Sequence, residues 1–406
     1  MINPKNIRIE DFSYHLPDEK IARFPMAERD CSKLCVAGKD EIKEDIFKNI
    51  TNYLPENSLL LLNDTRVVQA RLKFQKETGS IIEVFCLEPI SPVRDVQLAF
   101  QVKNSCEWKC LIGGAKKWKS GKLTKFIESI QTNISVERIE NLEDAFCIRF
   151  EWDHPDYVFA DIINSFGLMP LPPYLKREAE ESDNQRYQTI YAENQGSVAA
   201  PTAGLHFTDK VFQDLKSKNI EILNISLHVG AGTFKPVSSD KMEDHSMHAE
   251  QIVVSKRLVE KLVNQSEKPL ISVGTTSCRS IESLFWFGQL LEKDKNAEFF
   301  IPQWFPYETD SMSIVSKNKA LENILQRMNT EGVDELRGST QIILAPGYQF
   351  KMVDFLITNF HQPHSTLLLL VSAFYGEKWK EVYDFALKND FRFLSYGDSC
   401  LFLGNK

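Results

Sequence analysis

Residues 196–208, GSVAAPTAGLHFT, combine small side chains with a single titratable group, His206. Small residues let a backbone come within contact distance of a ligand, and Pro201 and Gly204 interrupt any regular helix. An imidazole has an unperturbed pKa of about 6.5, so His206 could transfer protons near neutral pH. A lone histidine in a turn is more often a packed core residue, but three later loops have the same small, polar character.

Each of these later loops follows an apolar segment that is typical of a buried strand. The predicted strands cover residues 220–229, 270–273 and 352–358, and they are followed by 230–233, 274–277 and 359–361. If the strands share one sheet, the loops gather at its carboxyl edge, where α/β proteins bind ligands. The helix predicted after residue 274 would offer backbone N–H groups to a carboxylate or phosphate. The candidate residues are His228, Gly230, Gly232, Thr233, Thr275, Thr276, Ser277, Arg279, Asn359 and His361.

An earlier apolar strand, residues 59–62, ends in Asn63-Asp64-Thr65-Arg66. Polar groups in this position could orient a substrate, which makes Asp64 and Arg66 binding candidates. An Asx turn in which Asp64 pairs with Arg66 explains the same residues equally well.

The chain has 406 residues, more than one hydrophobic core usually holds, which favours two domains. We expect an α/β main domain with a mixed sheet, formed by residues 1–66 and 154–406, with an elaboration at 284–341. Residues 67–153 show short alternating strands typical of a small inserted β-barrel. The sequence contains neither a secretory signal nor an apolar stretch of membrane-spanning length, so we expect a cytoplasmic protein.

Metal binding is not expected. The eight cysteines are scattered, without the paired spacing of zinc or redox motifs. The segment HSMHAEQ, residues 245–251, could supply ligands, but no further ligands follow at a recognisable spacing. Substrate contact or ordinary loop structure explains it better.

A lysine-rich stretch lies inside the predicted barrel of this acidic protein, whose formal charge is -8. Lys116, Lys117 and Lys119 flank Trp118 there. Cationic side chains beside an aromatic ring suit an RNA backbone and a stacked base. A solvated strand edge that discourages aggregation is the competing interpretation.

Several long motifs occur together in one order along almost the whole chain. They are DFSYHLPDEKIARFPMAERD, LLLLNDTRVVQARL, LPPYLKRE, RYQTIYAENQGSVAAPTAGLHFT, HVGAGTFKPV, HSMHAE, SVGTTSCRSIES, PGYQFKMVDFLITNFHQPHSTLLLLVSAFYG and FRFLSYGD. In these motifs the chain resembles the S-adenosylmethionine:tRNA ribosyltransferase-isomerase family of queuosine biosynthesis, with a long insert at 284–341.

The resemblance implies that S-adenosylmethionine is a co-substrate and that tRNA carrying an aminomethyl-deazaguanine base is the acceptor. The ribosyl part would be transferred and isomerised to give epoxyqueuosine-tRNA, adenine and methionine. We expect His206 to transfer protons, with His228 and His361 as alternates, and the oligomeric state stays open. The expected substrate-binding residues are Asp64, Arg66, Thr202, Gly204, Gly230, Gly232, Thr233, Thr275, Thr276, Ser277, Arg279, Tyr348 and Asn359.

Two other functions remain open. A noncatalytic tRNA-binding relative would bind tRNA without releasing adenine. An S-adenosylmethionine-dependent enzyme with a different acceptor would turn over without tRNA and would tolerate changes at Lys116, Lys117 and Lys119.

Overall fold

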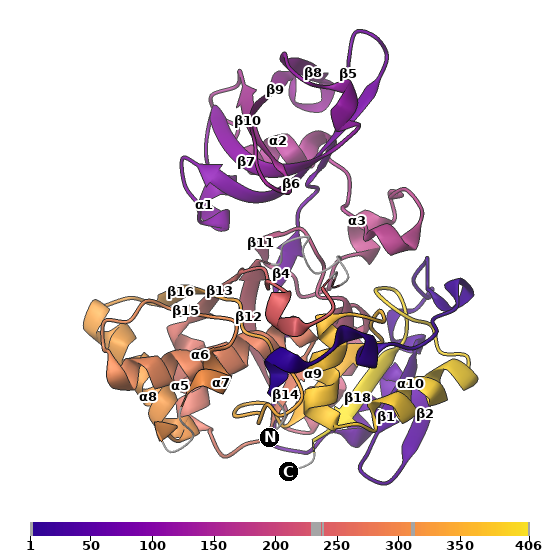
Figure 1. Cartoon of the computed structure of the whole chain (residues 1–406), viewed down its shortest axis with the longest axis vertical. Coiled ribbons are helices and arrows are strands. Elements are labelled where there is room, and N and C mark those ends of the chain that lie inside the picture. Colours follow the sequence, from indigo (N-terminus) through magenta and orange to yellow (C-terminus); the bar gives the residue numbers. More distant parts are fainter. Residues whose placement is uncertain (1–2, 229–236, 238, 310–312, 405–406) are drawn as a thin grey trace.

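The structure is a computed structural model that describes residues 3–228, 237, 239–309 and 313–404. Its largest element is a ten-stranded sheet (Figure 1). In spatial order the strands are β15 (Phe300–Ile301), β16 (Glu335–Thr340), β13 (Glu250–Ser255), β12 (Glu221–His228), β3 (Leu59–Asn63), β14 (Leu270–Val273), β17 (Phe355–Asn359), β18 (Ser399–Leu403), β1 (Lys33–Ala37) and β2 (Ile42–Ile46). The sheet is mixed, as predicted.

The four central strands, β12, β3, β14 and β17, are mutually parallel. Every residue of β3 and β14 is buried, which is typical of parallel strands covered on both faces. Because parallel strands end on the same side, the residues after β14 and β17 meet at one edge of the sheet. The strands predicted before the small, polar loops are β12, β14 and β17. They do share one sheet, as predicted.

Helices cover the sheet on both faces (Figure 1). They are α4 (Asp209–Ser217), α5 (Lys256–Asn264), α6 (Thr275–Lys293), α7 (Phe305–Glu308), α8 (Lys317–Glu331), α9 (Thr366–Tyr375) and α10 (Trp379–Lys388). Within the part of the chain that the structure describes, no helix has both the length and the apolar character needed to cross a membrane.

Residues 284–341 are part of the main body. They contribute the end of α6, then α7 and α8, and they add β15 and β16 to one side of the sheet. Helices α6 and α8 cross closely at Gly288, where an added Cβ would lie 2.2 Å from the carbonyl oxygen of Ala320.

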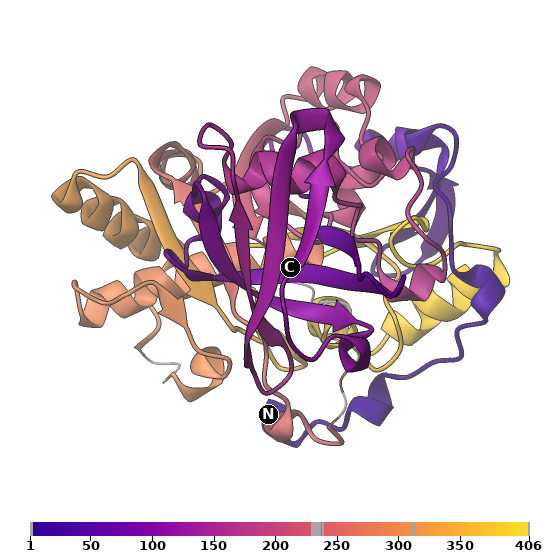
Figure 2. The ribbon, with the colours of Figure 1, turned by 90° about the horizontal axis from the view of Figure 1, so that it is seen from above.

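A second, six-stranded antiparallel sheet is formed by an intermediate part of the chain (Figure 1). Its strands, in spatial order, are β5 (Arg71–Gln75), β6 (Ile81–Ser91), β7 (Ser105–Gly113), β10 (Phe146–Trp152), β9 (Thr132–Asn141) and β8 (Leu123–Ile127). The edge strands approach each other, and Lys125 Nζ donates to the carbonyl oxygen of Lys73 at 3.2 Å. The sheet is thus a nearly closed barrel, and from above it lies over the middle of the larger body (Figure 2).

The barrel core extends beyond the predicted boundary at residue 153. Helix α2 (Phe159–Phe166) follows that boundary, yet Phe159 is fully buried among the barrel aromatics. Its ring centroid lies 5.2 Å from that of Trp108 and 5.1 Å from that of Phe150. Helix α1 (Val96–Phe100) packs against the same core through Phe100.

Two chain segments run side by side between the barrel and the main body. Strand β4 (Thr65–Val67) pairs in parallel with β11 (Asn194–Ser197). A lateral contact joins the two bodies as well, because Arg337 on β16 pairs with Asp95, which caps α1, at 2.8 Å. The short helix α3 (Asp183–Arg186) lies beside this junction (Figure 1).

Replacing Phe159 by alanine tests this barrel core. Deleting a fully buried aromatic ring removes apolar contacts and leaves a cavity, which costs about 3–5 kcal/mol of unfolding free energy. Phe126→Ala, on strand β8 of the same barrel and 50% exposed, is the matched control. Urea denaturation measures both variants, and equal losses would show that Phe159 is not at the centre of the core.

Candidate functional site

A cleft lies at the carboxyl edge of β14 and β17, with a cavity volume of about 110 Å³. Its walls come from residues 199–203, the start of α6, and residues 358–362. A cavity of this size can enclose a ring-sized group of a ligand. The cleft brings together these predicted site residues: Thr202, Thr275, Thr276, Arg279, Asn359 and His361.

The start of α6 forms one wall of the cleft. Gly274 precedes the helix with φ of +90°, a conformation that favours glycine over every other residue. The first backbone N–H groups of a helix have no partner inside the helix, and they favour negative charge. The predicted residue Ser277 is also buried there, and its Oγ has no hydrogen-bond partner among the described residues.

Glu250 and Arg279 form an ion pair in the cleft wall. Arg279 Nη1 lies 3.0 Å from Glu250 Oε2, and Arg279 Nε donates to the carbonyl oxygen of Ile342 at 3.1 Å. Burial raises the pKa of Glu250, while the charge of Arg279 opposes that rise. Glu250 was not among the site residues predicted from the sequence. The sequence indicated Glu250 only as part of the polar segment 245–251, which leads into β13.

His206 lies behind the cleft wall, at the end of the 3-10 helix Thr202–His206. Its Nδ1 lies 2.7 Å from Ser32 Oγ, and Asn359 Nδ2 donates to its Nε2 at 3.2 Å. Thr202 Oγ1 in turn donates to Asn359 Oδ1 at 2.8 Å. A continuous chain of polar atoms therefore runs from the cleft to the imidazole.

The environment of His206 keeps the imidazole neutral. Burial lowers its pKa to about 4, and the nearby carboxylate of Asp398 only partly opposes this shift. Because Asn359 donates to Nε2, the imidazole proton belongs on Nδ1, facing Ser32. His206 can therefore accept a proton at Nε2 at neutral pH.

The two alternate histidines differ in position. His361 lines the cleft, bonds through Nε2 to Thr358 Oγ1 at 2.9 Å, and has its pKa lowered to about 3 by burial. His228 is also buried, which lowers its pKa to about 4, but it does not line the cleft. It packs against Gly196, where an added Cβ would lie 2.2 Å from His228 Nδ1.

Among the described residues, three further predicted binding residues, Asp64, Arg66 and Gly204, lie outside the cleft lining. Asp64 accepts a hydrogen bond from Ser226 Oγ at 2.6 Å, whereas Arg66 is exposed on β4. The Asx turn forms on Asn63, whose Oδ1 accepts from the backbone N–H of Thr65 at 3.0 Å. Gly204 packs under Tyr191. Gly230, Gly232 and Thr233 lie outside the described residues.

Tyr348, another predicted binding residue, is buried in a polar network beneath the cleft. Its hydroxyl donates to Glu282 Oε2 at 2.6 Å and accepts from Trp286 Nε1 at 2.8 Å. Burial raises the pKa of Glu282, although Tyr348 and the N–H groups of residues 351–353 favour its charged form. Tyr348 therefore positions the segment that leads into β17.

On the barrel, an open groove contains Lys116 and Lys119 together with Arg138 and Glu140. Lys117 is exposed next to the groove. Trp118 is placed differently from our expectation, because its side chain is fully buried and its Nε1 donates to the carbonyl oxygen of Gly121 at 2.9 Å. Its ring fills the barrel core, so a base has no access to it.

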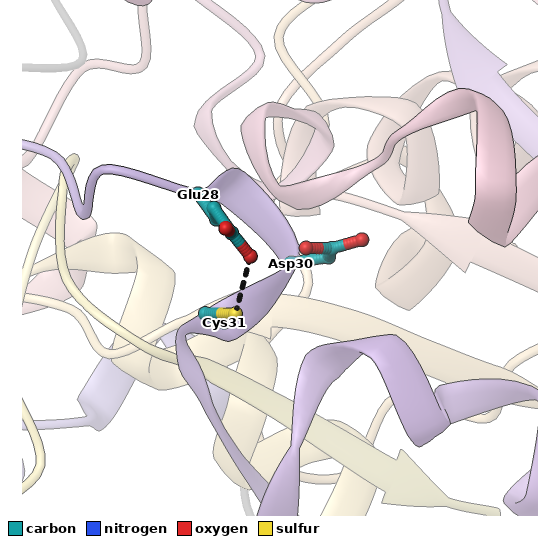
Figure 3. Close-up of side chains that lie close together, drawn as sticks. All are labelled: Glu28, Asp30 and Cys31. Atoms are coloured by element: carbon teal, nitrogen blue, oxygen red, sulfur yellow. Dashed lines mark hydrogen bonds between the residues drawn. The ribbon is translucent and has the colours of Figure 1, made fainter.

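Glu28, Asp30 and Cys31 lie close together on the 3-10 helix Arg29–Cys31 and the residue before it (Figure 3). Cys31 Sγ donates to Glu28 Oε2 at 3.1 Å, and this bond raises the pKa of the thiol. Asp30 Oδ2 accepts from Thr208 Oγ1 at 2.7 Å. Both the Cys31 thiol and the Asp30 carboxylate are thus held by hydrogen bonds.

Comparison with known proteins gives a full-length match. A relative from Halothermothrix orenii, named S-adenosylmethionine:tRNA ribosyltransferase-isomerase, is 38% identical over 98% of this chain and 100% of its own length. A relative of the same name from Trichlorobacter lovleyi is 36% identical over 97% of this chain and 99% of its own.

A crystal structure of S-adenosylmethionine tRNA ribosyltransferase from Thermotoga maritima is 26% identical, covers 97% of this chain and 100% of its own, and has a TM-score of 0.45. The family described as queuosine biosynthesis protein matches residues 9–402. Because this match and the two relatives span nearly the whole sequence, the chain belongs to the queuosine biosynthesis protein family.

Proposed function

We propose that this protein transfers the ribosyl part of S-adenosylmethionine to an aminomethyl-deazaguanine base in tRNA and isomerises it. The products are epoxyqueuosine-tRNA, adenine and methionine. The proposal is carried by full-length membership in a family whose relatives bear this enzyme name, combined with a cleft that gathers residues from distant loops.

The reaction needs a base and an acid. The sulfonium of S-adenosylmethionine acidifies the neighbouring 5′ carbon of the ribose, so a base can remove a proton there. Adenine leaves more readily when its ring is protonated, which requires an acid nearby.

We assign the base to His206. Its buried imidazole is neutral, and Nε2 points to Asn359 in the cleft wall. A ribose carbon that takes the place of the Asn359 amide at Nε2 presents its proton to this nitrogen. His361, which is also neutral and lines the cleft, is the alternate base.

The cleft and the barrel divide the remaining tasks. Thr202, Thr275, Thr276 and the Glu250–Arg279 pair line the cleft and would hold polar groups of the sulfonium substrate. The barrel, which we propose is a domain inserted into the main α/β body and extended by α2, would bind the tRNA backbone. Lys116, Lys119 and Arg138 supply positive charge for that contact.

The assay of the proposal is adenine release from S-adenosylmethionine with precursor-base tRNA, together with mass spectrometry of the tRNA nucleosides. We expect His206→Gln to lower adenine release by about 100-fold or more, because positioned proton transfer contributes at least that factor. His15→Gln, at an exposed histidine, is the control.

His361→Gln is measured in the same assay. A large loss at His361 combined with turnover near the parent level at His206 would assign the base to His361. Absence of adenine release from the unmodified protein, with tRNA binding retained, would refute the enzymatic proposal itself.

The pH profile provides a separate test of the buried imidazole. The pKa of His206 lies at about 4, below its ordinary value, so the neutral base is present at all higher pH values. We therefore expect that protonation of a histidine does not lower the rate of adenine release as the pH falls from about 8 to about 5. An acidic limb centred at about pH 6.5 would show that the base is a solvent-exposed histidine.

The double change Lys116→Glu and Lys119→Glu tests the barrel groove. We expect weaker tRNA binding and a shallower salt dependence of affinity, by about one unit of slope for each lost phosphate contact. Lys39→Glu, at an exposed lysine between β1 and β2, is the control. Filter binding over a salt series measures both, and unchanged affinity in the groove variant would place the tRNA elsewhere.

A further inference from the structure

A second, smaller hollow lies on the other side of His206 from the cleft, with a cavity volume of about 20 Å³. Its lining includes three arginines, Arg29, Arg186 and Arg392, together with His206, Ser32 and Ser395. Ser395 lines both the hollow and the cleft. The hollow and the cleft are therefore neighbours separated by His206 and Asn359.

Positive charge is in excess around this hollow. Among the described residues, its lining contains no carboxylate. The nearby Asp398 is occupied, because its Oδ1 pairs with Arg392 Nη2 at 2.9 Å and its Oδ2 accepts the backbone N–H of Arg392 at 2.7 Å. Burial, and then the neighbouring charge of Arg186, lower the pKa of Arg29. The charges of Arg29 and Arg186 thus repel each other, whereas the charge of Arg392 is balanced by Asp398.

Backbone carbonyls hold two of the arginines in place. Arg29 donates to the carbonyl oxygens of Leu205 at 3.1 Å and Gln185 at 2.7 Å. Arg186 donates to the carbonyl oxygens of Ala27, at 2.9 Å, and Met26. Arg186 Nε is buried and has no partner among the described residues. Fixed guanidinium groups with an unused donor are suited to bind an oxyanion.

We infer that an oxyanion of the substrates binds in this arginine-lined hollow, either the methionyl carboxylate of S-adenosylmethionine or a phosphate of the tRNA. The inference rests on the proposed function. The small volume excludes a base or a sugar. In S-adenosylmethionine the carboxylate is a short aliphatic chain away from the sulfonium. When the substrate displaces the Asn359 amide from His206 Nε2, a ribose in the cleft and a carboxylate in the hollow would place His206 beside the reacting carbon.

The carboxylate source is tested with decarboxylated S-adenosylmethionine, which keeps the sulfonium and the amine. We expect the parent protein to show a KM about tenfold or more higher for this analogue than for S-adenosylmethionine, as loss of a charged hydrogen bond predicts. In Arg186→Gln the KM for S-adenosylmethionine should rise to the analogue's value, with the analogue itself unaffected. Arg257→Gln, at an exposed arginine on α5, is the control.

The phosphate source gives a different pattern. The parent protein would then use both sulfonium compounds with the same KM. Arg186→Gln would weaken tRNA binding and reduce the salt slope by about one unit, while Arg257→Gln would not.

The inference is overturned if the parent protein releases adenine and the variants Arg186→Gln and Arg29→Lys behave like it. In that case both variants are folded by circular dichroism, and they change neither the KM for S-adenosylmethionine nor the binding of tRNA. The proposed function would survive that result. Failure of the parent protein to release adenine would instead refute the proposed function.

Discussion

The structure depends on the pairing of one buried imidazole. His206 is nearly inaccessible to solvent, and a buried polar group is costly unless its hydrogen bonds are made. Its two nitrogens form hydrogen bonds with Ser32, just before β1, and with Asn359, at the end of β17. Three segments that lie far apart in the sequence must therefore meet within hydrogen-bonding distance. This requirement fixes the small-residue loop against the sheet and creates the wall between the cleft and the arginine-lined hollow.

A second buried network supports the same wall from below. Glu282 on α6 accepts hydrogen bonds from Tyr348 and from the backbone N–H groups of residues 351–353, which lead into β17. Removing this carboxylate would leave several buried donors unpaired. These bonds lock helix α6, which begins at the cleft, to strand β17, which ends there. Tyr348, which we predicted from the sequence to bind substrate, is part of this buried network.

Local patterns were sufficient to predict the mixed sheet, the barrel and the loops that gather at the carboxyl ends of β14 and β17. They failed where long-range packing decides the outcome. Trp118 lies among exposed lysines in the sequence, yet its ring faces the barrel core. Phe159 follows the last barrel strand but completes the barrel interior. Glu250, Arg279 and the three arginines near His206 come from separate segments, so no spacing in the sequence could reveal that they converge.

Strands β4 and β11 pair with each other where the barrel joins the main body. Two hydrogen-bonded strands, together with the lateral contact between Arg337 and Asp95, therefore link the barrel to the main body. The span from the basic groove to the cleft is consequently set by the protein backbone. If tRNA binds along the barrel, as we propose, this distance would limit which nucleotide can reach the cleft. Selection among RNAs would then follow from length and curvature as much as from the identity of the base.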